Sequence, residues 1–265
     1  MTVPVLSIGF VSQDDPFYVR IFFEEFLRDC ERREIKVVVI APPMGKKSFA
    51  GLLLQMYDFY GGWDFLRMGF RYVLYKAAAK LPGRIRGGRC FSVAQVCRHF
   101  DIPVLTARDI NDSAFLDQLS RLGLDLIISV AAPQVFRERL IGLPRLGCIN
   151  IHNSKLPKYR GMLPNFWQMF HGEKSVGTTI HCINAGIDDG EILLQKETPI
   201  EAGESLDALI RRTKALGASL MNEMLRHFRA GSVTRIPNRK EDASYFTFPT
   251  GRDVGEFRRR GYRLL

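Results

Sequence analysis

Three side chains that could do chemistry together stand in the second half of the chain: an amide (Asn150), an imidazole (His152) and a carboxylate (Asp188). Asn150 and His152 lie two residues apart in the apolar run 148–152, so a strand there would point both side chains to the same face. They stand at the carboxyl end of that run, where open α/β sheets bind their ligands. Asp188 lies in a turn flanked by glycines, just before the run 191–200, which is also predicted to form a strand. We therefore expect the three residues to form one site.

An amide, an imidazole and a carboxylate without a serine or cysteine nucleophile indicate acyl transfer to a nucleophile that the substrate brings, such as an amine. The Asn150 amide can donate a hydrogen bond to the developing oxyanion. His152 can accept the proton of the attacking amine or, as imidazolium, share the oxyanion. Asp188 can fix the tautomer of the histidine and raise its pKa.

The same residues allow other interpretations. A single histidine at a strand end is more often structural than catalytic. Ser154 beside His152 could suggest a serine hydrolase, but no Gly-x-Ser-x-Gly elbow is present there. His152, His171 and His181 could suggest a metal site, but their spacing matches no ligand pattern, so no metal is expected.

The elements that must position these residues follow from hydrophobic patterning. Apolar, β-branched runs predict buried strands at 3–11, 35–40, 103–107, 124–131 and 148–152, and alternating runs predict half-exposed strands at 176–183 and 191–200. Helices are predicted from Asp14-Asp15-Pro16 onward, at 112–122 and at 205–228. Strand, helix and strand at this spacing are typical of an α/β protein with a doubly wound, mostly parallel sheet.

Composition narrows the class of protein. Of 265 residues, 46% are hydrophobic and the formal net charge is +10, which favours anionic partners such as phosphorylated molecules, nucleic acid or acidic lipid. Five cysteines without Cys-x-x-Cys spacing predict reduced thiols and a cytoplasmic protein. With no secretory signal and no run of 18 uncharged apolar residues, neither export nor a transmembrane segment is expected.

Residues 147–195 resemble the catalytic core of the folate-dependent formyltransferases, which include glycinamide ribonucleotide, methionyl-tRNA and amino-sugar formyltransferases. Their signature Asn-x-His-x-Ser-Leu-Leu-Pro is matched by Asn-Ile-His-Asn-Ser-Lys-Leu-Pro at 150–157, followed by an aromatic residue, Arg and Gly. Gly-Ile-Asp-Asp-Gly-Glu-Ile at 186–192 matches their Asp-x-Gly turn, with Asp188 rather than Asp189 in the catalytic place. A general resemblance extends over roughly 100–230.

The resemblance implies a Rossmann-like formyltransferase fold that uses 10-formyltetrahydrofolate as co-substrate, with no NAD, no metal and no covalent enzyme intermediate. It also implies that backbone groups after the strand at 124–131 hold the pterin, although this segment departs from familiar family versions. Ile187, on the loop that carries Asp188, would form the opposite wall. The implied pterin-binding residues are Ala131, Ala132, Pro133, Gln134 and Val135.

The motif leaves the formyl acceptor open. Cationic side chains and flat aromatic rings lie beside the motif, so a small anionic or phosphorylated amine is favoured as the acceptor. A nucleotide-linked amino sugar is the first candidate of this class. Lys155 also replaces the leucine usual in the family. The predicted acceptor-binding residues are Ser154, Lys155, Tyr159, Arg160 and Gly161. Methionyl-tRNA is the second alternative, and glycinamide ribonucleotide or another small amine the third. A folate-binding scaffold without catalysis and a hydrolase that releases formate remain further alternatives.

The chain divides into a catalytic domain at 1–235 and a C-terminal extension at 236–265. An aromatic and basic insertion at 48–90 interrupts the catalytic domain, and Gly61-Gly62 predicts its division into two helices. The insertion fits a helical pair on the sheet edge, a homodimer contact, a substrate lid or a membrane-surface helix. The Arg-rich extension fits a loosely docked terminus, an anion-binding arm or a strap across the fold.

Overall fold

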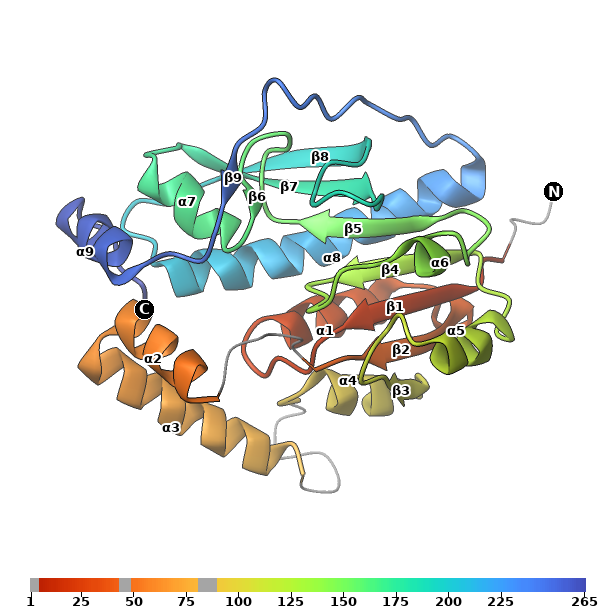
Figure 1. Ribbon diagram of the computed structural model, residues 1–265, viewed down its shortest axis with the longest axis horizontal. Helices are drawn as coiled ribbons and strands as arrows, with labels where there is room; N and C mark the ends of the chain where they lie inside the picture. Colours follow the sequence, from red (N-terminus) through yellow and green to blue (C-terminus); the bar gives the residue numbers. More distant parts are fainter. Residues whose placement is uncertain (1–4, 43–48, 81–89) are drawn as a thin grey trace.

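The computed structural model describes residues 5–42, 49–80 and 90–265, so parts of the predicted insertion, 43–48 and 81–89, lie outside the described residues. A seven-stranded sheet in the order β3-β2-β1-β4-β5-β7-β8 forms the centre of the molecule (Figure 1). Its strands are β1 Ile8–Ser12, β2 Ile35–Ile40, β3 Val104–Thr106, β4 Leu126–Val130, β5 Cys148–His152, β7 Ser175–Cys182 and β8 Ile192–Pro199. The first five strands are mutually parallel, and β7 runs antiparallel to both of its neighbours, β5 and β8. The predicted fold class, a doubly wound and mostly parallel sheet, is therefore confirmed.

Helices cover both faces of this sheet. Buried side chains of α1, α4 and α8 join one core with the strands, and those of α5 and α6 join a second core with the strands. The helices are α1 Val19–Asp29, α4 Val93–His99, α5 Ser113–Ser120, α6 Glu138–Ile141 and α8 Leu206–Ala230, with a short 3₁₀ turn at Arg32–Glu34. The chain leaves β1 toward β2 but leaves β4 toward β5, so a ligand crevice is expected at the carboxyl ends of β1 and β4.

The predicted start of the first helix is confirmed within a few residues. The Asp15 carboxylate accepts hydrogen bonds from the backbone N–H groups of Phe17, Tyr18 and Val19 at 2.8–3.0 Å. These groups have no partner inside the helix, so a carboxylate at this position stabilises its beginning. Asp15 thereby fixes the loop that leaves the carboxyl end of β1.

A smaller core lies beyond the antiparallel strands and includes the C-terminal extension. Phe257 of α9 (Gly251–Arg259) is completely buried and stacks on Phe166 of α7 (Pro164–Phe170) at 4.6 Å between ring centroids. Strand β9 (Tyr245–Phe246) pairs with β6 (Arg160–Gly161) in a separate two-stranded sheet. The extension therefore runs as a strap across the fold. The division into domains at residue 235 stays a prediction.

The described part of the insertion is a helical hairpin at the edge of the molecule, outside the sheet (Figure 1). Helix α2 (Phe49–Tyr60) and helix α3 (Gly62–Ala78) meet at Gly61, whose φ of 74° is accessible to glycine at little cost. The predicted division at the glycine pair is confirmed. Within residues 5–42, 49–80 and 90–265, no helix is long and apolar enough to cross a bilayer.

Candidate active site

Strand pairing brings a second histidine to Asn150. Asn150 on β5 stands opposite His181 on the antiparallel strand β7, and the Asn150 Nδ2 atom lies 3.1 Å from His181 Nε2. The other ring nitrogen, Nδ1, lies 2.8 Å from the carbonyl oxygen of Cys182. A carbonyl only accepts, so Nδ1 carries the hydrogen and Nε2 accepts from the Asn150 amide. An amide has two N–H groups, so this bond uses one and sets the direction of the other.

His181 is held in its neutral form. Burial and the neighbouring His152 lower its pKa, and the Asp188 carboxylate acts in the opposite direction, which leaves the pKa at about 4. At neutral pH the ring therefore accepts a hydrogen bond from Asn150 and carries no charge. The sequence placed His181 only in a rejected metal site, because its pairing with Asn150 depends on the strand register.

His152 is oriented by a backbone carbonyl. Its Nε2 atom lies 3.0 Å from the carbonyl oxygen of Tyr159, so Nε2 carries the hydrogen in the neutral ring. Its Nδ1 atom faces the Asp188 carboxylate at 3.7 Å, which is longer than a hydrogen bond. The Tyr159 carbonyl thus selects the tautomer, a part that the sequence assigned to Asp188, and Nδ1 is left as the basic nitrogen.

Asp188 lies between the two histidines. Its Oδ2 atom accepts from the backbone N–H of Gly161 at 2.9 Å, and its Oδ1 atom lies 3.6 Å from His181 Nε2. The three predicted catalytic residues are therefore brought together, although their chemical roles stay predictions. In the described part of the chain, no group of three or more His, Cys, Asp or Glu side chains is arranged to hold a metal ion.

The loop that carries Asp188 is fixed by the C-terminal extension. The Asn238 side chain donates to the carbonyl oxygens of Asp188 and Gly190 at 3.0 and 2.9 Å. Its own oxygen accepts from the buried Arg160 guanidinium at 2.8 Å. Sequence reasoning missed Asn238, which stands in a polar segment with no hydrophobic pattern to mark it.

Backbone strain gathers around this site. Four non-glycine residues in the loops next to it have φ between 51° and 61°, a region that L-residues rarely adopt. They are Ala131, Tyr159, Leu163 and Asp188. Such strain persists only where the surrounding structure fixes it, and it is concentrated at functional sites.

The predicted pterin loop follows β4. Ala131, Ala132 and Pro133 are half-buried, and the exposed Val135 side chain leaves an apolar surface. The Gln134 side chain is engaged by the protein: it accepts from the Ile110 N–H and donates to the carbonyls of Pro42 and Arg108. Ile187 on the facing loop is also exposed. Folate contacts of these five residues and of Ile187 stay predictions.

The predicted acceptor-binding residues mostly have protein partners. Ser154 is fully buried and donates to the Lys158 carbonyl, and Lys155 lies 3.0 Å from Glu197. The Tyr159 hydroxyl donates to Glu173, and its ring stacks on Phe246. Arg160 binds Asn238, and Gly161 binds Asp188, as described above. These contacts build the walls of the site, and acceptor binding by the five residues stays a prediction.

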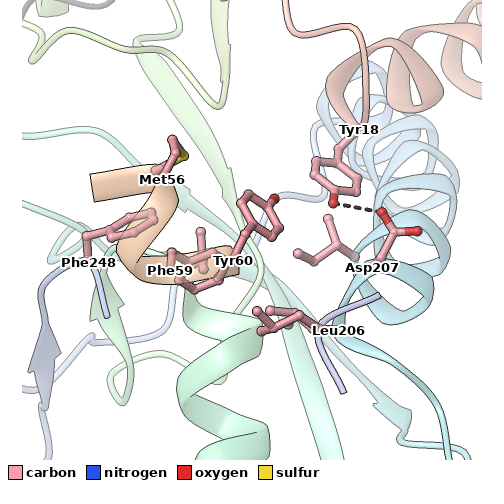
Figure 2. A pocket seen from close by; sticks show the side chains of 10 residues that line it. Tyr18, Met56, Phe59, Tyr60, Leu206, Asp207 and Phe248 are labelled. Atoms are coloured by element: carbon pink, nitrogen blue, oxygen red, sulfur yellow. Dashed lines mark hydrogen bonds between the residues drawn. The ribbon is translucent and has the colours of Figure 1, made fainter. Parts of the chain in front are cut away.

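An apolar cavity of about 170 Å³ lies between the hairpin and helix α8 (Figure 2). Tyr18 and Asp207 meet in it through a 2.8 Å hydrogen bond, and Tyr60 points into it. Burial alone would raise the pKa of Asp207, but hydrogen bonds from Arg211 and Tyr18 hold it below its usual value. The remaining lining residues are apolar: Met56, Phe59, Leu163, Leu206, Ile210, Phe248 and Leu264.

The cavity is linked to the end of strand β5 through helix α8. Ile210 lies one turn before Thr213, whose hydroxyl accepts from the amide of Asn153, the residue after His152. The residue after Thr213 is Lys214, whose pKa is shifted from its ordinary value. Burial lowers the pKa of Lys214, and the Asp15 carboxylate at the end of β1 opposes that effect.

Fold and site together define the class. A parallel sheet that ends in an antiparallel pair carries an Asn-x-His strand against an aspartate loop, and residues 74–225 match the formyl transferase family. This match covers more than half of the chain, so the protein belongs to that family.

Individual relatives agree with this assignment. The chain is 41% identical over 146 residues to a methionyl-tRNA formyltransferase of Syntrophus aciditrophicus (strain SB), a match that covers 55% of this chain and 47% of that protein. It thus spans about half the length of the curated relatives it matches.

Solved structures share the fold at low identity. A glycinamide ribonucleotide transformylase of Symbiobacterium toebii is 19% identical with a TM-score of 0.59, and the match covers 88% of this chain and 94% of that chain. An N-formyltransferase of Helicobacter canadensis, in complex with folinic acid and dTDP-3-aminofucose, is 17% identical with a TM-score of 0.57, covering 91% and 71%.

Proposed function

We propose that this protein transfers a formyl group from 10-formyltetrahydrofolate to a primary amine. The observation that carries the proposal is the arrangement of Asn150, His152 and Asp188, with His181 directing the Asn150 amide. This arrangement supplies a hydrogen-bond donor for an oxyanion, a base with one free ring nitrogen, and a carboxylate beside that base. Family membership supports the same chemistry.

In the proposed reaction the amine nitrogen attacks the formyl carbon, and a new C–N bond forms. The carbonyl electron pair moves to the oxygen, where the second N–H of Asn150 stabilises the negative charge. The ammonium proton passes to His152 Nδ1, and the nearby Asp188 carboxylate stabilises the resulting imidazolium. When the bond from the formyl carbon to N10 breaks, this proton goes to N10. The products are a formamide and tetrahydrofolate, with no covalent enzyme intermediate.

The donor site is proposed between the loop at 131–135 and the loop of Asp188. The exposed side chains of Val135 and Ile187 offer apolar surfaces for the pterin, and the strained backbone at Ala131 supports a ligand-binding loop. Folinic acid in the Helicobacter canadensis structure supports a folate donor on this fold.

For the acceptor we propose a small anionic amine, first a nucleotide-linked amino sugar. The basic chain, with a net charge of +10, favours a phosphorylated molecule. The dTDP-linked amino sugar in the Helicobacter canadensis structure supports this class. Methionyl-tRNA is the second candidate, supported by the 41% identity to the Syntrophus aciditrophicus enzyme. A cytoplasmic location fits either acceptor and is part of the proposal.

The test offers the protein 10-formyltetrahydrofolate with a panel of amines and with methionyl-tRNA. Mass spectrometry then measures the formation of tetrahydrofolate and of the formylated amine. Asn150→Ala, His152→Ala and Asp188→Ala should each lower turnover by at least about 100-fold, as single oxyanion or acid–base groups do. Asn222→Ala, on the part of α8 that contacts α1, is the matched control and should leave turnover unchanged. Near-full activity of His152→Ala would overturn the mechanism, and no product with any acceptor would overturn formyl transfer.

A further inference from the structure

Helix α3 carries a stripe of large apolar side chains on its exposed side. Trp63, Leu66, Phe70 and Val73 recur at intervals of three and four residues, so they share one face of the helix. Their exposed fractions are 79%, 63%, 67% and 65%. We call these four residues the outward face of α3. A surface helix ordinarily turns such a stripe toward the core.

Three of the four charged side chains of α3 contact the body of the protein, whereas Arg67 is exposed. Lys76 lies 3.3 Å from the Asp14 carboxylate, and Asp64 lies 3.8 Å from Arg258 of α9. Arg71 stacks over the ring of Phe17 at 5.8 Å. These contacts, together with the buried side chains of Phe59 and Met68, hold the hairpin to the body, while the outward face stays exposed.

Helix α2 extends the exposed apolar surface. Leu53, Leu54 and Tyr57 are exposed, and the Tyr57 ring meets Phe65 of α3 edge to face at 5.6 Å between centroids. Ten of the eighteen exposed large apolar side chains in the described part of the chain lie on these two helices. Such a concentration marks an interaction surface, because single exposed apolar residues are ordinarily scattered.

The charges next to the outward face are positive. Arg67 and Lys80 are exposed there, whereas Asp64 is turned inward and the Asp58 carboxylate accepts from the Gly251 N–H. A second copy would bring the same cations against each other. An anionic lipid surface instead offers negative headgroups to the cations and an apolar layer to the rings. Trp63 and Tyr57 are residue types that favour the membrane interface.

We propose that the α2–α3 hairpin binds the surface of an anionic lipid bilayer, with α3 lying flat and its outward face inserted among the headgroups. Helix α3 has 17 residues, about 26 Å in length, and runs along the outside of the molecule (Figure 1). The outward face is separate from the candidate active site, so this inference does not depend on which amine is formylated.

The chain carries a built-in probe for this interaction. It has two tryptophans: Trp63 on the outward face, and Trp167, which is buried and donates to the Thr247 carbonyl. Titration of the full chain with vesicles of phosphatidylcholine and phosphatidylglycerol should shift the tryptophan emission to shorter wavelength. Trp63→Phe should abolish the shift, and co-sedimentation with the vesicles should give the affinity.

Affinity should fall at least about tenfold on pure phosphatidylcholine vesicles and with the double change Leu66→Glu and Phe70→Glu. Leu216→Glu, an exposed apolar residue on α8, is the matched control and should bind like the unaltered chain. No emission shift and no sedimentation at millimolar lipid would overturn the proposal. So would a dimer in sedimentation velocity that the double variant dissociates, because the face would then belong to a second copy. Formyl transfer to a water-soluble acceptor should be unaffected in the double variant, which separates this test from that of the active site.

Discussion

Two backbone carbonyls give the two histidines of the site different chemistry. The Cys182 carbonyl accepts from His181 Nδ1, and the Tyr159 carbonyl lies within hydrogen-bond distance of His152 Nε2. The free nitrogen of His181 therefore meets the Asn150 amide, where a proton would break a hydrogen bond. The free nitrogen of His152 meets the Asp188 carboxylate, where a proton is stabilised. We infer that His152 is the base and His181 a positioning residue.

His181→Ala removes the acceptor that directs the Asn150 amide. We expect kcat to fall about 10- to 100-fold, less than in Asn150→Ala, with little change in donor KM, because the oxyanion bond matters most in the transition state. His181→Gln keeps an acceptor oxygen and should recover part of the rate. Steady-state kinetics of the three variants test this, and an unchanged kcat in His181→Ala would contradict it.

The buried His181 also makes stability depend on pH. Its pKa is about 4 in the folded chain, against 6.5 for an unperturbed histidine, so the unfolded chain binds more protons between these values. The stabilisation is fully present above pH 6.5 and is lost as the pH falls toward 4, by at most about 3 kcal/mol. Urea unfolding from pH 7.5 to 4 should show a steeper loss for the unaltered chain than for His181→Gln. Parallel curves would show that His181 does not contribute.

The sequence predicted Asn150, His152 and Asp188 because their residue types and spacing are themselves the signal. It did not predict the part played by His181, which lies 31 residues from Asn150 and meets it only through antiparallel pairing. It also did not predict the Tyr159 carbonyl, because any residue supplies a carbonyl and the sequence carries no mark of its direction.

At the scale of elements, the loop of Asp188 depends on contacts from three other segments. Gly190 packs so closely that an added Cβ would lie 2.0 Å from the Cys182 carbonyl oxygen. Gly161 of β6 donates to the carboxylate, and Asn238 donates to two carbonyls of the loop. Together these contacts hold Asp188 in its strained backbone conformation.

Asn238→Ala should loosen this loop. It removes the donor to the carbonyls of Asp188 and Gly190 and the shorter of two bonds from the buried Arg160 guanidinium, which keeps the backbone carbonyl of residue 238. We therefore expect about 1–3 kcal/mol lower unfolding free energy and a lower kcat. Urea unfolding and turnover test both effects. Asn222→Ala, which loses one long bond to the Phe26 carbonyl, is the control. Equal stability and turnover in the two variants would show that the strap does not support the site.

The positions of the strands were predicted well, and β2 and β5 match their predicted bounds. Strand β7 was predicted to be half-exposed, and this is wrong, because all its residues between Ser175 and Cys182 are buried. Helices α7 and α9 and the pairing of β6 with β9 were not predicted. These elements are short, and their stability comes from packing on one another, as in the stack of Phe166 on Phe257. Local patterning carries no information about such partners.

At the scale of the whole molecule, the smaller core ties residues after 236 to the preceding part of the chain. Phe257 is completely buried between Phe166 and Tyr262, with ring centroids 4.6 and 5.0 Å away. Val254 and Leu264 are buried in the same cluster. The extension therefore contributes apolar surface to the fold in addition to its bonds at the site.

Phe257→Ala should lower the unfolding free energy by about 3–5 kcal/mol, the range for removing a buried aromatic side chain. Equilibrium urea unfolding measures it. Arg259→Ala on the exposed side of the same helix is the control and should change stability by less than about 0.5 kcal/mol. A similar small change in Phe257→Ala would mean that α9 is not part of the cooperative unit.

The hydrogen bonds from Asn238 to the loop of Asp188 affect when the site is completed during synthesis of the chain. Ribosomal synthesis runs from the amino terminus, so Asn150, His152, His181 and Asp188 all emerge before residue 238. A nascent chain that ends before this residue carries every proposed catalytic group but lacks the amide that secures the aspartate. We therefore expect the proposed site to become competent only after residue 238 has been made, when the strap closes over a sheet whose strands are already complete.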